Sequence, residues 1–239
     1  MISYIEKLSL QDVAHLPNGS IKTRILAMYS GYGTSFDFLD FWLQKEGEKT
    51  TAAICRFEGA AWLLASEDAN WEELSSFLKV IAPTLLADAK TAESLGLTPF
   101  EKFFEVSKEA AEGQSDTKTP PIMQIYDMLM SGADGDIEIP NKTEWYADIS
   151  HRLRHETAKA AATKNAVALA GFVAEDSALI TGVATDSSQR SKGEGKAVLD
   201  ELLKALYPRI VYAEATERAV GFYLKCGFSH SAVLVRCRT

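Results

Sequence analysis

The chain has 239 residues, of which 46% are hydrophobic, 24% charged and 10% aromatic, and its formal net charge at pH 7 is −8. This composition is typical of a globular protein and excludes the disordered, collagen-like and coiled-coil classes. An acidic chain does not in general attract nucleic-acid backbones or anionic lipids, and no apolar run reaches the ~18 residues that a membrane-spanning helix requires.

The first half of the chain is expected to contain helices followed by strands. The amphipathic segment 21–30 and the aromatic-rich segment 36–44 are predicted to be helices, separated by a glycine-containing turn. The segments 50–57 and 60–65 are predicted to be strands. The next stretch, 66–73, is acidic and contains no glycine, and it leads into a further helix.

A polar segment near the middle of the chain, 112–121, contains one glycine and two prolines and has no apolar periodicity. Such a segment is typical of a linker. We therefore predict an N-terminal lobe of residues 1–113, a linker of residues 114–121 and a C-terminal lobe of residues 122–239.

A weak internal repeat supports the prediction of two lobes. A shift of about 108 positions places 50–64 over 158–172 and Asp40 over Asp148. The two halves share a pattern of apolar residues more than identical residues. We interpret the first lobe as a diverged copy of the second.

The second half is predicted to begin with helices and to continue with strands separated by single helices, which indicates a mixed α/β sheet. The predicted helices are 122–130, 143–153, 193–207 and 218–225, and the predicted strands are 157–163, 166–173, 177–185, 210–214 and 231–237.

The loop that follows the strand 177–185 carries Gln-Arg-Ser-Lys-Gly-Glu-Gly-Lys at 189–196. Glycines at the start of a helix let backbone N–H groups approach a ligand closely, and the first N–H groups of a helix favour an anion. Arg190, Lys192 and Lys196 add positively charged donors at the same place. The segment is therefore predicted to bind the phosphate groups of a small molecule.

Other kinds of phosphate-binding loop fit this segment less well. A nucleotide-hydrolase loop, GxxxxGK[ST], is excluded because the chain has GEGKAV at 193–198. A dinucleotide-binding fingerprint, GxGxxG, needs a third glycine where Val198 stands. Glu214 follows at the end of the next strand, where such a fingerprint has its acidic residue, so a dinucleotide site remains an alternative.

Two motifs of the second half resemble those of the GNAT superfamily of N-acetyltransferases. Arg190-x-x-Gly193-x-Gly195 is similar to the R/Q-x-x-G-x-G/A signature, and the segment 219–228 is similar to the A-x-x-FY-x-x-x-GF segment. The resemblance extends over 143–239 and only loosely over the first half, which lacks the loop. It implies a GNAT-like α/β fold in two tandem lobes, of which the N-terminal lobe is degenerate.

The resemblance also implies a function, the transfer of an acetyl group from acetyl-CoA to an amine by direct attack. Acetyl-CoA, the cosubstrate, is expected between the strands 177–185 and 210–214, and Tyr223 is expected to protonate the departing thiolate. The alternative is that the glycines only form turns and that Tyr223 only packs in the core. The residues expected to hold acetyl-CoA are Val183, Ala184 and Thr185 at the pantetheine arm, Arg190, Ser191, Lys192, Gly193, Glu194, Gly195 and Lys196 at the pyrophosphate, and Thr216.

The chain departs from the family pattern in two respects. Thr216 stands where the family usually has an asparagine that helps to hold the cofactor. The strand 177–185 has no carboxylate that would deprotonate an acceptor ammonium; Glu175, Asp176 and Asp186 lie outside it. The base is therefore expected to be a water chain or a residue elsewhere, unless the acceptor arrives neutral. A non-catalytic module that binds acyl-CoA remains a second possible function.

The acceptor is expected to be a small-molecule or peptide amine, with no nucleic-acid or membrane partner. The loop 132–140, where the superfamily commonly selects its acceptor, contains Asp134, Asp136 and Glu138. We hypothesise that these acids attract a cationic amine; the alternative is a solvated acidic turn. The sequence does not indicate the oligomeric state.

No metal site is expected. The acids of the loop 132–140 do not follow calcium-loop spacing, and the segment from His151 to His155 lacks the glutamate of a zinc-protease helix. The three cysteines have no metal-ligand spacing and the first residues show no secretory-signal pattern, so a cytoplasmic location is expected.

Overall fold

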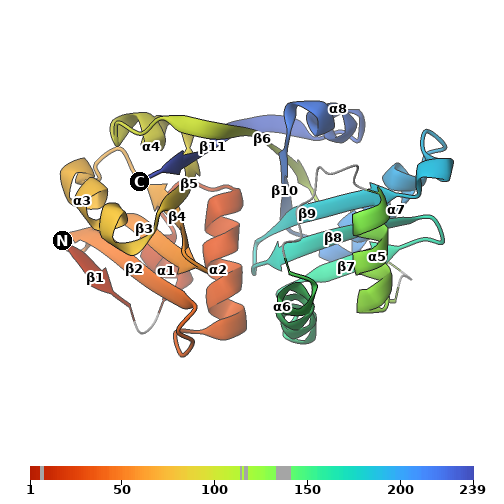
Figure 1. Cartoon of the computed structure of the whole chain (residues 1–239), viewed down its shortest axis with the longest axis horizontal. Coiled ribbons are helices and arrows are strands. Elements are labelled where there is room, and N and C mark those ends of the chain that lie inside the picture. The colour runs from red at the N-terminus through yellow and green to blue at the C-terminus, as the bar shows by residue number, and fades with distance from the viewer. Residues whose placement is uncertain (6–7, 114, 116–117, 133–140) are drawn as a thin grey trace. The chain divides into compact units, whose positions relative to one another are not determined.

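A computed structural model of the chain describes residues 1–5, 8–113, 115, 118–132 and 141–239. The described residues form two compact units, whose elements are labelled in Figure 1. Unit 1 comprises Met1–Glu105 and His230–Thr239, and unit 2 comprises Val106–Ser229.

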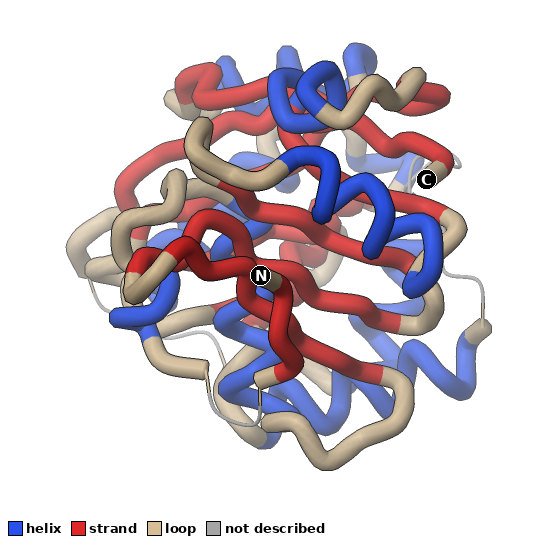
Figure 2. Tube along the Cα trace, turned by 90° about the vertical axis from the view of Figure 1, so that its left-hand side faces the viewer, coloured by secondary structure: helices blue, strands red, loops and turns tan. Residues whose placement is uncertain are grey.

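Unit 1 contains strands in the order β1-β2-β3-β4-β5-β11-β6. The pairs β1–β2, β2–β3, β3–β4 and β5–β11 are antiparallel, whereas β4 and β5 are parallel. Figure 2 distinguishes strands from helices by colour. The strands are β1 (Ile2–Tyr4), β2 (Leu39–Glu46), β3 (Lys49–Phe57), β4 (Ala60–Ala65), β5 (Thr84–Asp88), β6 (Pro99–Glu109) and β11 (Ser229–Arg238), and the helices are α1 (Leu10–Val13), α2 (Ser20–Tyr32), α3 (Trp71–Ile81) and α4 (Ala89–Ser94).

Helix α3 shows how local sequence determines an element of unit 1. The side-chain oxygen of Asn70 accepts a hydrogen bond from a backbone N–H of the first turn at 3.0 Å. Leu74 and Leu78 lie one turn apart and are buried against β3, β4 and β5. The helix ends shortly before Pro83, which disfavours helical geometry in the residue that precedes it.

The predicted helix over 36–44 is wrong, because strand β2 occupies most of this segment. Leu39, Phe41 and Leu43 are at most 2% exposed, whereas Trp42 between them is only partly buried. This alternation has the two-residue period of a strand. The aromatic side chains fit the pleated surface of the sheet, so tertiary packing decides against the helical interpretation.

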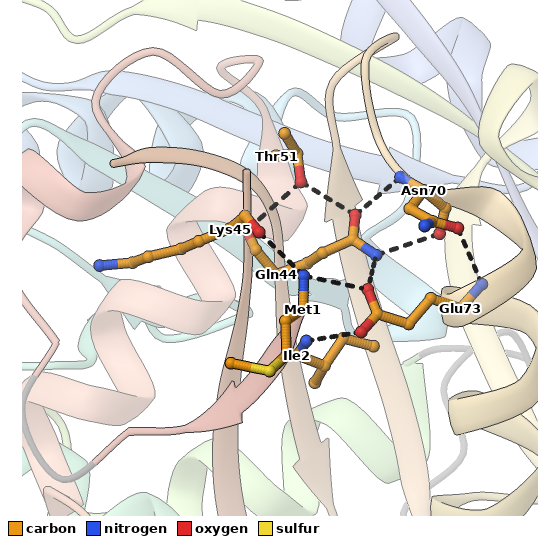
Figure 3. A network of polar contacts seen from close by, with 7 residues as sticks. All are labelled: Met1, Ile2, Gln44, Lys45, Thr51, Asn70 and Glu73. Carbon is orange, nitrogen blue, oxygen red and sulfur yellow. Dashed lines mark hydrogen bonds and ion pairs between the residues drawn. The ribbon is translucent and has the colours of Figure 1, made fainter. Parts of the chain in front are cut away.

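Figure 3 shows a polar network that joins β1, β2 and β3 to α3 within unit 1. The buried side-chain amide of Gln44 donates to the Asn70 carbonyl at 3.0 Å and to Glu73 Oε2 at 2.8 Å. Its oxygen accepts from the Asn70 N–H and from the Thr51 hydroxyl, each at 2.9 Å. Glu73 also accepts from the N–H of Ile2 at 2.9 Å. Both donors and both acceptor positions of Gln44 are satisfied, so the network holds these elements together despite its burial.

Unit 2 contains strands in the order β6-β10-β9-β8-β7. The pairs β7–β8 and β8–β9 are antiparallel, and β9 and β10 are parallel. Its remaining strands are β7 (Lys159–Ala162), β8 (Ala166–Val173), β9 (Ser177–Thr185) and β10 (Ile210–Ala215), and its helices are α5 (Ile122–Gly132), α6 (Lys142–Arg154), α7 (Glu194–Leu206) and α8 (Glu217–Lys225), with a short 3-10 helix at Ser187–Gln189.

Helices cover both faces of the unit 2 sheet. Helices α5 and α6 contribute Ile125 and Ile149 to a buried cluster on one face. Alternate residues of β8 divide between the faces, so Leu169 joins that cluster and Ala168 joins the other. Helix α7 packs on the second face with five side chains that are at most 1% exposed, namely Val198, Leu199, Leu202, Leu203 and Leu206. The predicted mixed α/β fold is confirmed.

The order of elements in the two units indicates a different alignment of the two halves from the 108-residue shift predicted from the sequence. In unit 1 the run is β2, β3, β4, α3 and β5, and in unit 2 it is β7, β8, β9, α7 and β10. Each run has three antiparallel strands, a helix and a strand parallel to the third. Strand β3 therefore corresponds to β8, whereas the 108-residue shift places it over β7. Asp40 lies in a strand and Asp148 in a helix, so the predicted equivalence of these two residues is wrong.

The compact units divide the chain at other residues than the lobes predicted from the sequence. The first division lies between Glu105 and Val106, and the second between Ser229 and His230. Three positions of the predicted linker, 114–121, lie outside the described residues. The lobe boundaries remain a prediction.

In the described parts of the chain, no helix has both the length and the apolar character needed to cross a membrane. The three cysteines, Cys55, Cys226 and Cys237, are buried thiols that form no disulfide. Burial raises the pKa of each thiol, so these side chains are neutral at pH 7.

Candidate functional site

Strands β9 and β10 pair only at their amino ends. Their paired residues run from Ser177 and Ile210 to Ile180 and Ala213. A β-bulge lies at the same point, because the pairing of β8 with β9 shifts there and leaves Thr181 without a residue opposite it. The two strands therefore separate towards their carboxyl ends, the place where open α/β sheets commonly bind ligands (Figure 1).

A cavity of about 420 Å³, here called the strand-end cavity, lies where β9 and β10 separate. Strand β9 lines it with Thr181, Gly182 and Val183, strand β10 lines it with Glu214, and helix α8 lines it with Tyr223 among others. A second cavity of about 610 Å³, the helix-start cavity, lies at the beginning of α7.

The strand-end cavity and the helix-start cavity adjoin, since several residues line both, and the two together are here called the cleft. These shared residues are Gly132, Val183, Arg190, Arg218 and Phe222.

The start of helix α7 is open to a ligand. Gly193 occupies the N-cap position in the left-handed region, with φ of 87°, and no side chain caps the helix. In contrast, Asn70 caps α3 and Thr216 caps α8 through their side-chain oxygens. The first backbone N–H groups of α7 therefore lie at the helix-start cavity without a side-chain acceptor, as an anion site requires.

The three predicted cations have different positions. Arg190 lines the cleft, and its guanidinium donates to the carbonyl of Gly132 at 2.9 Å. Lys196 also lines it and forms an ion pair with Asp200 at 2.5 Å. Lys192 donates instead to two groups of its own loop, at 3.1 and 3.2 Å, and does not line either cavity of the cleft.

Helix α8 supplies two cations that are not among the predicted site residues. Arg218 and Lys225 both line the helix-start cavity. Their seven-residue separation corresponds to two helical turns, so they lie on one face of α8. Arg218 directly precedes the second family-like motif and Lys225 lies within it, so their positions beside this motif were the available signal.

Two further residues of the loop have structural roles that their sequence positions did not reveal. The carboxylate of Glu194 accepts from the Thr163 hydroxyl at 3.1 Å and from the Asn165 amide at 3.2 Å, which fixes the first turn of α7 to the β7–β8 turn. At Gly195, an added Cβ would lie 3.1 Å from Thr185 Oγ1. Glycine at this position therefore allows α7 to begin close to the end of β9.

The remaining predicted cofactor residues fall into two groups. Val183 and Thr185 line the cleft together with Ser191, which adopts a positive φ of 62°. Ala184 points to the opposite face and packs with α5 and α6. Thr216 lines the strand-end cavity, and its hydroxyl accepts from the N–H of Ala219 at 3.3 Å, so it caps α8 as well.

Tyr223 is 7% exposed and lines the strand-end cavity. Burial raises the pKa of its phenol, and nearby Cys226 raises it further. The phenol is therefore protonated throughout the physiological range. A protonated hydroxyl beside the separating strands is suited to donate a proton to a strong base such as a thiolate.

Glu214 is the one carboxylate among the described residues that line the strand-end cavity. It lies at the end of β10, within the same cavity as Tyr223. The sequence pattern indicates Glu214 only as the acidic residue of a dinucleotide site and does not predict this position. The available signal was its location at the carboxyl end of a strand parallel to β9, where open α/β sheets commonly bind ligands.

Other sequence hypotheses receive little or no support from the site. Val198 is fully buried in the core, which disfavours the dinucleotide alternative because that site needs a glycine there. The acidic loop hypothesis falls on 133–140, outside the described residues. The rings of His151 and His155 lie 4.2 Å apart, and the described residues contain no group of three potential metal ligands.

Comparison with family models finds a match in the second half of the chain. Residues 122–228 match the model of the acetyltransferase (GNAT) family. No match was found among curated protein sequences.

Solved structures of low sequence identity share the fold. A GCN5-related N-acetyltransferase from Sphaerobacter thermophilus has a TM-score of 0.56 at 14% identity, over 100% of this chain and 95% of that chain. A tandem GNAT protein from the clavulanic acid biosynthesis pathway has a TM-score of 0.51 at 12% identity, over 99% and 97%. Saccharomyces cerevisiae N-myristoyltransferase, solved with bound myristoyl-CoA, has a TM-score of 0.52 at 11% identity, over 99% and 78%.

Proposed function

We propose, from the match of residues 122–228 to the acetyltransferase (GNAT) family, that the protein transfers an acetyl group from acetyl-CoA to an amine. The family match supports the broader class, an acyl-CoA-dependent N-acyltransferase. The observation that carries the proposal is the cleft formed by the two adjoining cavities, one where β9 and β10 separate and the other at the uncapped start of α7.

The helix-start cavity would hold the pyrophosphate of acetyl-CoA. The first N–H groups of α7 are the proposed donors, and Arg190, Arg218 and Lys225 line the cavity with positive charge. The part of β9 that does not pair with β10, including Val183 and Thr185, is the proposed contact for the pantetheine arm. This arrangement would bring the thioester to the strand-end cavity.

Glu214 and Tyr223 are the proposed proton-transfer groups of the strand-end cavity. The Glu214 carboxylate would accept a proton from the acceptor ammonium, and the neutral amine would form the new N–C bond as the C–S bond breaks. Tyr223 would give its proton to the departing thiolate. The nitrogen then loses a second proton, which restores the phenol, and Glu214 releases the first proton to solvent, so atoms and charges balance. The acceptor is proposed to be a small-molecule or peptide amine.

The test measures thiol release from acetyl-CoA with a panel of amines, alongside the shift in melting temperature caused by CoA. A ligand that binds only the folded state raises the melting temperature by mass action. We expect CoA to stabilise the protein and at least one amine to give turnover. Binding without turnover would support a non-catalytic acyl-CoA-binding module instead, and stabilisation by NAD(H) but not by CoA would contradict both proposals.

Two variants and a longer donor sharpen this test. Glu214→Gln removes the proposed base at nearly constant volume, and we expect about a 10- to 100-fold fall in kcat at neutral pH with a smaller loss at alkaline pH, where the amine is already neutral. Glu217→Gln, at an exposed position of α8, is the matched control. Myristoyl-CoA in place of acetyl-CoA measures donor preference, and faster turnover of the long chain would contradict acetyl transfer.

A further inference from the structure

A third cavity, of about 540 Å³, lies within unit 1 and is lined by residues of that unit. It has the same place in unit 1 that the strand-end cavity has in unit 2. Strands β4 and β5 are parallel, their pairing ends at Trp62 and Leu86, and Leu64 and Asp88 line the cavity beyond that point. We call it the unit 1 cavity; its volume lies in the range of small-molecule sites, about 300–1,000 Å³.

The helix that begins beside the unit 1 cavity does not offer an anion site. Asn70 caps the start of α3, so a backbone N–H that is left open in α7 is occupied here. Glu72 and Glu73 in the first turn place negative charge at the same end. The unit 1 cavity is therefore unsuited to a diphosphate, unlike the cleft of unit 2.

Glu105 is a buried carboxylate in the wall of this cavity, only 3% exposed. Its Oε2 accepts from the Ser20 N–H at 2.7 Å and from the Ser20 hydroxyl at 2.6 Å, and its Oε1 accepts from the Ser231 hydroxyl at 2.7 Å. All three donors are neutral. A carboxylate has about four acceptor positions, so these three bonds leave room for one more donor on Oε1.

The other charged groups of the wall do not neutralise Glu105. Lys90 forms an ion pair with Glu67 on the outside, where the two side chains are 71% and 81% exposed. Asp88 adds a second carboxylate and accepts from the N–H and hydroxyl of Thr91, at 2.9 and 2.5 Å. The described lining thus has three carboxylates and one lysine, and the buried carboxylate has only neutral partners.

Apolar side chains form the rest of the wall. Ile21, Leu64 and Leu234 are buried residues that line the unit 1 cavity, and Trp71 lines it from the start of α3. A buried charge is stabilised most by an opposite charge that also hydrogen-bonds to it. The chemistry complementary to this cavity is therefore a positive N–H donor joined to an apolar group.

We propose that the unit 1 cavity binds a small organic cation whose ammonium group donates to Glu105 and whose apolar part contacts the wall that includes Trp71. This binding site is additional to the acyl-transfer site proposed for unit 2. Its test needs no acyl-CoA, so the two proposals fail or succeed separately.

The test uses isothermal titration calorimetry on the full chain with phenethylamine as the probe. The comparison ligands are 2-phenylethanol, which keeps the shape without the charge, and 3-phenylpropionate, which reverses the charge. We expect phenethylamine to bind about tenfold more tightly than the alcohol and the anion to bind least. No heat of phenethylamine binding up to about 10 mM, or equal affinity for amine and alcohol, would overturn the proposal.

Glu105→Gln tests whether Glu105 is the residue that makes the cavity prefer the amine to the alcohol. A structural role at the start of α2 alone predicts a lower melting temperature with an unchanged ratio of amine to alcohol affinity. The proposal predicts that this ratio falls from about tenfold to about twofold or less. Glu93→Gln, at an exposed position of α4 outside the cavity, is the control and is expected to leave the ratio unchanged.

A second pair of variants keeps the test decisive if Glu105→Gln does not fold. Ser94 lines the cavity from the exposed surface of α4. Ser94→Arg introduces a competing cation without touching Glu105, and we expect it to weaken phenethylamine binding about tenfold. Ser94→Gln adds comparable bulk without charge and is expected to change affinity less than threefold. Equal affinity of the two variants would contradict an electrostatic site.

Discussion

Tyr223 and Glu214 line one cavity from neighbouring elements, α8 and β10, and their environments differ. Tyr223 is almost fully buried, and this burial keeps its phenol protonated. Glu214 is only partly buried at the end of its strand. An acid that retains its proton and a carboxylate that retains some contact with solvent are a suitable pair for moving protons in opposite directions.

Tyr223→Phe removes only the phenolic hydroxyl and so tests whether Tyr223 is the proton donor. We expect kcat to fall about 10- to 1,000-fold with KM for acetyl-CoA changed less than threefold, since the ring still packs against Phe222 and Phe228. Steady-state kinetics with a saturating amine provides the measurement. Tyr207→Phe, at a position 48% exposed, is the control. An unchanged kcat would show that Tyr223 only packs in the core.

The raised pKa of Tyr223 also predicts the pH dependence of the reaction. The phenol is active while protonated, and a raised pKa extends the protonated range upwards, so Tyr223 is expected to cause no loss of kcat below about pH 10. A pH profile of kcat from about pH 6 to the alkaline limit of stability measures this. A fall in kcat that begins below about pH 9 in the unmodified protein and is absent from Tyr223→Phe would contradict the expectation.

At the scale of elements, the start of α7 differs from the start of α3 in its capping and in its charge, and both differences affect which ligands each can bind. Gly193 has no side chain and leaves the first N–H groups of α7 open, whereas Asn70 occupies one N–H of α3. The unit 1 helix also begins with Glu72 and Glu73. Two helices at corresponding positions thus have opposite electrostatic preferences at their first turns.

Gly193→Asp and Gly193→Asn test the open start of α7. Both variants place a side chain of similar size at a residue with φ of 87°, a conformation that asparagine and aspartate tolerate better than most residues. Only aspartate adds a negative charge beside the proposed pyrophosphate. We expect the Kd for CoA to rise about tenfold more for the aspartate variant, with a difference that shrinks at high salt. Equal Kd values would place the pyrophosphate elsewhere.

The element assignments that sequence predicted best are those of unit 2. The helical spacing from Val198 to Leu206 predicted α7, and the run 177–185 predicted β9 with the same bounds. The segment 36–44 was misread because its aromatic residues fit helical spacing as well as strand alternation. A short apolar segment is ambiguous in this way until a neighbouring strand supplies its hydrogen-bond partners.

At the scale of the whole molecule, strands β6 and β11 include residues of both compact units. The residues Val106–Glu109 of β6 belong to unit 2, and His230–Arg238 of β11 belong to unit 1. Unit 1 is therefore built from two segments that are distant in sequence, whereas unit 2 is one continuous segment. A division of the chain at the predicted linker would separate unit 2 from part of its own sheet, because β6 neighbours β10.

Two fragments test this organisation. The fragment 122–239 follows the predicted lobe, whereas the fragment 106–239 retains the residues of unit 2 that precede it. We expect the shorter fragment to be less soluble and to melt at a lower temperature, because it leaves the edge of β10 unpaired. Circular dichroism melting and size-exclusion chromatography provide the comparison. Equal melting temperatures would support the boundary predicted from the sequence.

The sequence by itself determined the mixed α/β class, the glycine-rich start of α7 and the position of Tyr223 on the following helix, because these depend on local spacing and turn chemistry. Only the tertiary structure decided that Glu214, Arg218 and Lys225 line the same cleft, and that Lys192 does not. It also decided that a buried carboxylate, Glu105, faces a separate cavity in unit 1. The physical reason is that a cavity is formed by segments distant along the chain, whose approach depends on strand pairing and packing that no local pattern encodes.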